Sequence, residues 1–215
     1  MKIKFLILIL VICLPFSGVA KTIELTYEFE DGEQLSRQYD DSAKDLVLYI
    51  SDSKNSMPLK KIKNIKGLEN WKNLENFDSY GIDYSGDLLF FNNIKNLKSI
   101  SFDFFKCKNL SFLENLTGLE FIEMHLSLDK KDYKDFENTK IDFSKLKKLR
   151  KITFSAYYFD NGKFVGKLNR IPQFVNVQNK PELIFYENDI NELTARDKKL
   201  LKQYSKCVLG EKIKL

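Results

Sequence analysis

The residue type best suited to proton transfer near neutral pH occurs once in the chain, at His125. A nucleophilic site built on His125 needs a hydroxyl and a carboxylate, and the strand alignment described below places Ser155 and Asp103 beside it. Neighbours in adjacent parallel strands lie in a flat row, without the backbone donors of an oxyanion hole. The flat row also disfavours metal binding by His125, Glu123 and Asp103, because metal ligands must converge on one point. We therefore expect no enzymatic activity, cofactor or metal, with a hydrolase using His125 as a remote alternative.

The composition is that of a folded, globular chain. Hydrophobic residues make up 43% of the 215 residues and charged residues 30%, which is enough for one domain with a sizeable core. Nine glycines and four prolines exclude collagen-like and linker-dominated chains, and three cysteines are too few for a disulfide scaffold. These numbers leave a soluble core-forming domain as the class to explain.

Residues 1–20 have the features of a secretory leader. Lys2 and Lys4 supply a basic start, and residues 5–14 form an unbroken apolar run that is too short to span a bilayer. Small residues lead up to Ala20, after which we expect cleavage. The sequence thus predicts export from a bacterial cell, to the periplasm or to the medium.

Two alternatives to cleavage stay open, and both affect the mature chain. One is an uncleaved anchor; the other is a lipoprotein modified at Cys13, which the large Ile12 before it disfavours. Cleavage removes two lysines and lowers the formal net charge from +5 to +3. For an exported chain of nearly balanced charge we expect no nucleic-acid partner. After cleavage of residues 1–20 we expect no stable membrane insertion. For Cys107 and Cys207 we favour two free thiols over a bridge, because the expected architecture separates them.

An apolar pattern with a fixed offset recurs along the chain. Each copy ends in an alternation of period two, which predicts a short strand with one buried face. One copy cannot bury its own apolar residues, so we expect the copies to stack and their strands to pair in a parallel sheet. The copies are Trp71-x-x-Leu74-x-x-Phe77-x-Ser79, Ile94-x-x-Leu97-x-x-Ile100-x-Phe102, Leu116-x-x-Leu119-x-x-Ile122-x-Met124 and Leu146-x-x-Leu149-x-x-Ile152-x-Phe154, with a degenerate fifth ending in Leu183-x-Phe185.

These copies resemble the leucine-rich repeat family in its bacterial, internalin-like form. The closest stretch is FLENLTGLEFIEMHL at 112–126, and the resemblance covers about residues 62–190. The longer third and fourth units imply inserted loops at 129–140 and 160–170. Family repeats carry an asparagine three places after the last strand hydrophobe, and irregular turns follow from its absence in most units. That position holds Ile82, Phe105, Ser127, Tyr157 and Asn188.

The resemblance implies an α/β solenoid, a leucine-rich repeat stack with a parallel β-sheet and a cap at each end. The N-terminal cap is expected as a β-hairpin of strands Thr22–Phe29 and Leu35–Tyr39, followed by a first sheet strand at Asp45–Ile50. The C-terminal cap is expected as a helix from Thr194 to about Lys206. The organisation is a signal peptide at 1–20, a β cap and first strand at 21–61, irregular repeats at 62–190 and a helical cap at 191–215.

The strand residues that alternate with the apolar ones face the concave side of the expected sheet. They mix aromatic, charged and hydroxyl side chains, and aromatic residues on such a surface are candidate anchors for a partner. Ordinary cross-strand packing is the alternative explanation. The candidate partner-binding residues are Asp78, Tyr80, Ser101, Asp103, Phe121, Glu123, His125, Thr153, Ser155 and Tyr186.

The resemblance also implies a function in binding. We expect an exported, non-catalytic protein that binds another protein, such as a host surface protein, an envelope protein or a toxin, through the concave face. The alternative is a structural or self-assembling component of the cell envelope. A second aromatic group at Tyr157, Tyr158 and Phe159 is a further candidate surface.

Overall fold

The computed structural model describes most of the chain. The described residues are 8–9, 21–51, 61–84, 88–106, 110–132, 136, 138–167, 170–185, 193–209 and 213–214, and at 8–9, 49–51, 104–105 and 213–214 the backbone alone is described. Most of the expected leader lies outside them, so its cleavage stays a prediction. Cys107 and the candidate residue Tyr186 also lie outside the described residues.

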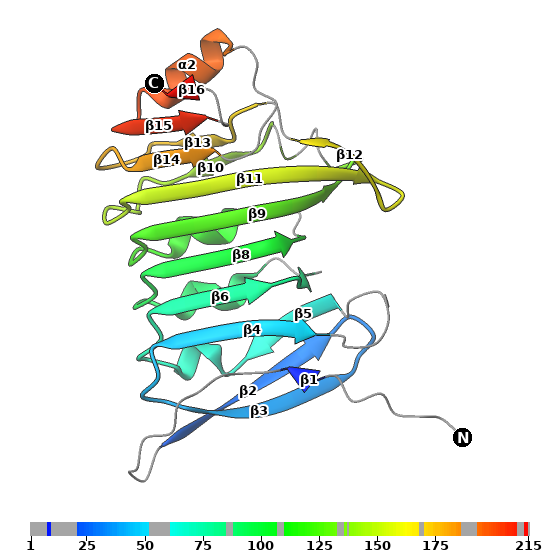
Figure 1. The fold of residues 1–215 in the computed structure, drawn as a ribbon. Helices are drawn as coiled ribbons and strands as arrows, with labels where there is room; N and C mark the ends of the chain where they lie inside the picture. Colours follow the sequence, from blue (N-terminus) through cyan, green and yellow to red (C-terminus); the bar gives the residue numbers. More distant parts are fainter. Residues whose placement is uncertain are drawn as a thin grey trace.

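A large, mainly parallel β-sheet runs through the molecule (Figure 1). Its strands lie side by side in chain order, and each neighbouring pair from β4 to β15 is parallel. The predicted large parallel sheet is therefore confirmed. The parallel strands, in spatial order, are β4 (Asp45–Ser51), β6 (Asn76–Tyr80), β8 (Ser99–Phe105), β9 (Phe121–Asp129), β11 (Lys151–Asp160), β14 (Glu182–Phe185) and β15 (Lys206–Leu209). The antiparallel additions are β1 (Leu8–Ile9) on β4, β12 (Lys163–Lys167) on β11 and β16 (Ile213–Lys214) on β15.

The apolar strand residues of the recurring pattern lie directly beside one another. Each is at most 2% exposed. A slip of one residue would turn each of these side chains to water, so burial fixes the register. The parallel pairing of these strand residues, expected from the sequence, is confirmed. The pairs are Phe77 with Ile100, Ile100 with Ile122, Ile122 with Ile152, and Ile152 with Leu183.

The core lies between this sheet and the segments that connect its strands. Short 3-10 helices occupy three of these connections, η1 (Leu68–Asn70), η2 (Leu89–Asn93) and η3 (Ser111–Asn115). Phe77 meets Phe91 of η2 edge to face, with ring centroids 4.7 Å apart. Phe102 meets Phe112 of η3 in the same way at 6.1 Å. Such aromatic pairs contribute about 0.5–1.5 kcal/mol beyond burial. They therefore stabilise the packing of β6 and β8 against the connections that follow them.

Side-chain amides link successive connections. Asn73, Asn96 and Asn179 each stand four residues before the buried strand residue of their copy, and each donates from Nδ2 to a backbone carbonyl in the segment before the preceding strand of the large sheet. The third copy has Gly118 at this position, where an added Cβ would lie 2.8 Å from the carbonyl oxygen of Lys95. Three of the five copies thus have a bonded amide at this position and the third copy has a close backbone approach, whereas the fourth has Lys148, which is exposed. The acceptor carbonyls are those of Asp41, Lys72 and Lys147.

A second, four-stranded sheet closes the N-terminal end of the core (Figure 1). Its strands, in order, are β3 (Gln34–Asp40), β2 (Thr22–Phe29), β5 (Lys61–Lys66) and β7 (Asp83–Tyr84). The antiparallel pairing of β2 with β3 confirms the predicted hairpin. The buried hydroxyls of Tyr27 and Tyr39 lie 2.6 Å apart, and the Tyr39 ring packs 5.4 Å from that of Trp71. These contacts join the hairpin to the first copy.

The C-terminal end differs from the predicted helix in one respect. Helix α2 (Ala195–Leu201) begins after Thr194 as expected, with a capping box between Thr194 and Asp197. The predicted extension to about Lys206 is wrong, because the helix stops at Leu201 and β15 pairs with β14. The edge of β14 offers unpaired backbone groups, and a strand satisfies them where a helix would not. This pairing also buries Cys207, a free thiol, beside Leu183.

The third and fourth units, which are the longer ones, lengthen the sheet along the direction of its strands. Strands β9 and β11 continue past their neighbours, and β11 turns at Asn161 and Gly162 into β12 (Figure 1). Most of the second expected inserted loop, 160–170, is therefore an antiparallel hairpin. Part of the connections forms a separate parallel pair, β10 (Lys140–Asp142) with β13 (Gln173–Val175).

Candidate functional site: the outward face of the sheet

The large sheet has one face on the core and one turned away from it, called here the outward face. Strand alternation places every described candidate residue on this outward face, next to at least one buried neighbour in its own strand. Cross-strand pairing arranges most of them in two rows, and places Phe121 in a third row between Ser99 and Lys151. One row is Val47, Asp78, Ser101, Glu123 and Thr153; the other brings together Tyr80 with Asp103 and His125 with Ser155.

Three large apolar side chains of the outward face are open to solvent. Tyr80 is 40% exposed, Phe121 41% and Val47 37%. Arg150 lies over the Phe121 ring, 5.9 Å from its centroid. Both aromatic residues were expected from the sequence; Val47 was not, although the alternation of β4 places it in the row of Asp78. The face therefore offers apolar contact area on a hydrogen-bonded sheet.

Carboxylates gather between these apolar residues. Asp78 has a raised pKa, because burial disfavours its charged form and because Asp45 and Glu123 are negatively charged neighbours. The pKa of Tyr80 is raised by burial and then by Asp78, Asp103 and Glu123. The negative charges of this face thus lie close enough to act on one another.

The polar group around His125 differs from the one expected. His125 Nδ1 lies 2.6 Å from Ser155 Oγ, as the alignment predicted, but the carboxylate at its Nε2 is Glu123 of its own strand, at 3.2 Å. Asp103 instead pairs with Tyr80 across strands. The serine is 1% exposed, so an attacking hydroxyl could not reach a substrate there. The arrangement is a hydrogen-bonded chain that holds the His125 ring in place.

Two candidate residues are less accessible than expected. Thr153 is 5% exposed and Ser155 1% exposed, although both lie on the outward side of β11. Short side chains between longer neighbours such as Glu123 and Ile184 are covered even on an open sheet. The described candidate residues that solvent reaches therefore lie on β6, β8 and β9.

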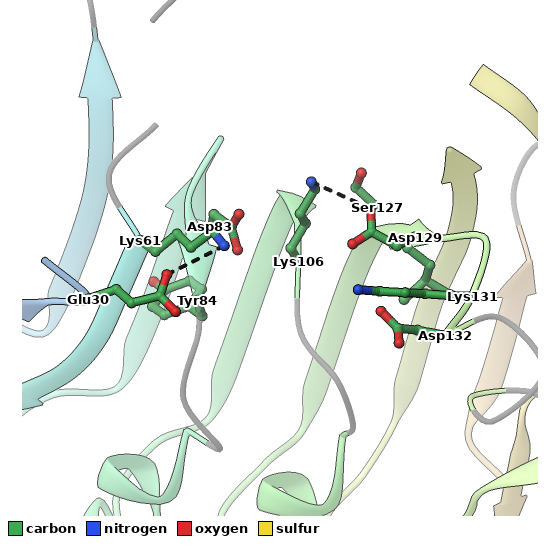
Figure 2. A pocket seen from close by; sticks show the side chains of 10 residues that line it. Glu30, Lys61, Asp83, Tyr84, Lys106, Ser127, Asp129, Lys131 and Asp132 are labelled. Atoms are coloured by element: carbon green, nitrogen blue, oxygen red, sulfur yellow. Dashed lines mark ion pairs between the residues drawn. The ribbon is translucent and has the colours of Figure 1, made fainter. Parts of the chain in front are cut away.

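A separate polar cleft of about 370 Å³ lies where the ends of β5, β7, β8 and β9 meet (Figure 2). Its charges pair internally, with Lys61 3.4 Å from Glu30 and Lys106 3.9 Å from Asp129. Asp83 at its side has a pKa raised by burial. Mixed charges that already pair do not define the charge of a ligand, so the cleft is a weaker candidate than the outward face.

The fold and the outward face together define a β-rich protein with a large parallel sheet and one exposed, mixed aromatic and acidic surface. No protein-family model, no curated protein and no solved structure matches the chain. Within the described residues, no three His, Cys, Asp or Glu side chains are grouped as a metal ion would require. The described part of the chain also holds no helix with the length and apolar character needed to cross a membrane.

Proposed function

We propose that this is an exported, non-catalytic protein of the leucine-rich repeat type that binds another protein through the outward face of its sheet, which is the concave face of the expected solenoid. The observation that carries the proposal is the presence of exposed Tyr80 and Phe121 on a sheet face that also carries carboxylate and hydroxyl side chains. Aromatic side chains provide large contact area at low cost in conformational entropy, and they are frequent energetic anchors of protein interfaces. A hydrogen-bonded sheet holds them in place before binding.

The repeat assignment is supported by the spacing of the copies and by their register. The buried strand residues of successive copies pair directly. In the first four copies a leucine stands three residues before the buried strand residue and another large apolar residue stands six residues before it. Stacking of this kind buries a continuous core that no copy could bury alone. Solenoid architecture is thus the simplest physical account of a chain that adds strands in order.

The absence of catalysis is supported by the surroundings of His125. Its hydroxyl partner Ser155 is buried, and its other ring nitrogen, Nε2, bonds the carboxylate of Glu123 in the same strand. Turnover assays with ester and amide substrates, using His125→Ala as the matched variant, test this point. Activity that disappears in His125→Ala would favour the hydrolase alternative.

Binding is tested by crosslinking and pull-down from envelope and host-surface extracts with the exported chain. The variant Tyr80→Ala/Phe121→Ala should lower recovery of a specific partner about tenfold or more, because each anchor can contribute about 2 kcal/mol. Leu89→Ala is the matched control, since Leu89 is 48% exposed but lies on η2. Equal recovery with both variants would move the binding surface off the outward face.

A second candidate function, self-assembly, is favoured by β12. Phe164 is 57% exposed and Val165 44% exposed on a strand that pairs with β11 on one side. An exposed apolar edge strand is a template for pairing with another copy. Sedimentation of the wild type and of Phe164→Lys separates the two functions: concentration-dependent assembly that the variant abolishes would favour the structural role.

Export is tested by fractionating the source cells and sequencing the N-terminus of the mature chain. A first residue of Lys21 is the expected result. Lipid attachment at Cys13 or retention of residues 1–20 would each contradict it.

A further inference from the structure

The charge of the outward face points to the chemistry of its partner. Outward positions of β4, β6, β8 and β9 carry carboxylates and no lysine or arginine; the first outward lysine comes at Lys151 of β11. Apart from Asp129, which ends β9 and lies 3.9 Å from Lys106, these carboxylates are Asp45, Asp78, Asp103 and Glu123. One half of the face is therefore acidic, although the whole chain is slightly basic.

Three basic side chains at the border of this acidic half have partners, whereas Lys151 stands beside Phe121 on the next strand, β11. Lys44 and Lys98 both pair with Glu75 at the strand starts, at 3.1 and 2.7 Å. Arg150 pairs with Glu120 at 3.5 Å. The hydrogen bonds of the face carboxylates come from a neutral amide, Asn76 to Asp45, and from the His125 ring to Glu123. The local excess of negative charge is thus left for a partner to neutralise.

The exposed aromatic residues stand at opposite corners of this acidic half. Tyr80 pairs with Asp103, whereas Phe121 lies two strands away and pairs with Ser99 beside Asn76. The offset of four residues along a strand is about 13 Å, and two strand spacings are about 10 Å. The diagonal, about 16 Å, is the length of about five extended residues. Asp78 and Glu123 lie between these two apolar contacts, Asp103 lies beside Tyr80, and Asp45 flanks the area on β4.

We propose that the outward face binds a basic, extended segment of a partner protein, with apolar side chains on Tyr80 and Phe121 and lysine or arginine side chains on the carboxylates between them. This inference rests on the proposed function and adds the charge and size of the bound segment. Opposite charge gives orientation and rate, while the aromatic corners give affinity.

The test uses the mature chain and three labelled peptides of about nine residues. They share leucines near both ends and differ in the central positions, which hold lysine, glutamine or glutamate. Fluorescence anisotropy should show binding of the lysine peptide, weakened at high salt because surface charges are screened. Asp78→Asn/Glu123→Gln should weaken it about tenfold, from two charges at contact distance in a high-dielectric surface. Glu24→Gln/Glu69→Gln is the control with the same change in net charge at exposed positions outside the face.

Each outcome decides the proposal. Equal weakening by both double variants would mean attraction to net charge and would overturn it, as would equal binding of the three peptides. Binding that needs Tyr80 and Phe121 but not the carboxylates would refute the basic segment and leave the docking face standing. Binding that ignores Tyr80→Ala/Phe121→Ala would refute the proposed function itself. Self-association that displaces the lysine peptide would assign the face to a second copy and also overturn the proposal.

Discussion

Replacing Gly118 by alanine tests how closely successive connections of the sheet approach one another. An added Cβ would lie 2.8 Å from two backbone oxygens, those of Leu97 and Lys95. Carbon and oxygen atoms ordinarily stay about 3.3 Å or more apart, and backbone oxygens move less easily than the ends of flexible side chains. The third and second copies would have to separate at this point.

The size of the effect follows from two opposing contributions. Overpacking of this kind costs about 1–3 kcal/mol. Alanine also restricts the unfolded chain, which returns about 0.4–1 kcal/mol. We therefore expect Gly118→Ala to lower the free energy of unfolding by about 1–2 kcal/mol.

Equivalent positions in the other copies supply the controls. Asn96→Ala removes the 2.6 Å hydrogen bond to the carbonyl of Lys72 and should cost about 1 kcal/mol. Lys148 is exposed, so Lys148→Ala should stay within about 0.5 kcal/mol of wild type. The expected order of destabilisation is Gly118→Ala, then Asn96→Ala, then Lys148→Ala.

Urea unfolding of the mature chain measures this order. The single tryptophan, Trp71, is 1% exposed, and its fluorescence should report the loss of the core. An unchanged dependence on urea would show that the variants unfold the same surface. If Gly118→Ala is no more destabilising than Lys148→Ala, the close approach of the two connections is refuted.

Three further predictions concern single groups. Asp78→Asn should raise stability at neutral pH, because the raised pKa means that ionisation of Asp78 is costly in the folded state; the gain should shrink as pH falls through that pKa, measured by urea unfolding across pH. Thr194→Ala should cost about 1 kcal/mol, since Thr194 Oγ1 bonds Asp197 at 2.6 Å, and Thr194→Ser should restore most of it in thermal unfolding. Cys207 is 6% exposed and burial raises its thiol pKa, so peptide mapping should find it unalkylated until the protein unfolds; rapid native alkylation would contradict its placement.

The strands were the most predictable part of the fold. Period-two alternation at Phe77, Ile100, Ile122 and Ile152 identified buried strand residues, and the constant offset aligned them. The pattern is strong because register and burial depend on the same residues. The C-terminal helix was less predictable, since a free sheet edge at β14 competes for the residues after Leu201.

The linking asparagines show a limit of motif-based prediction. The family pattern directed attention to positions after each strand, whereas Asn73 and Asn96 act before it. Their pairing with the preceding copy depends on how two connections stack, which no single copy encodes. An internal alignment of Asn73, Asn96 and Asn179 at one offset was the signal that could have found them.

On the candidate site, strand alternation by itself determined which side chains leave the core, including Tyr80 and Phe121. Tertiary structure alone decided which of them solvent reaches, because exposure depends on the size of neighbours in other strands. In the folded chain Ser155 is buried and bonds His125, whereas Val47 is exposed beside Asp78. The fold also brings Asp45 and Glu123 close enough to Asp78 to raise its pKa. The period of a strand is local and can be read from the chain, whereas accessibility and electrostatic coupling arise only when distant segments lie side by side.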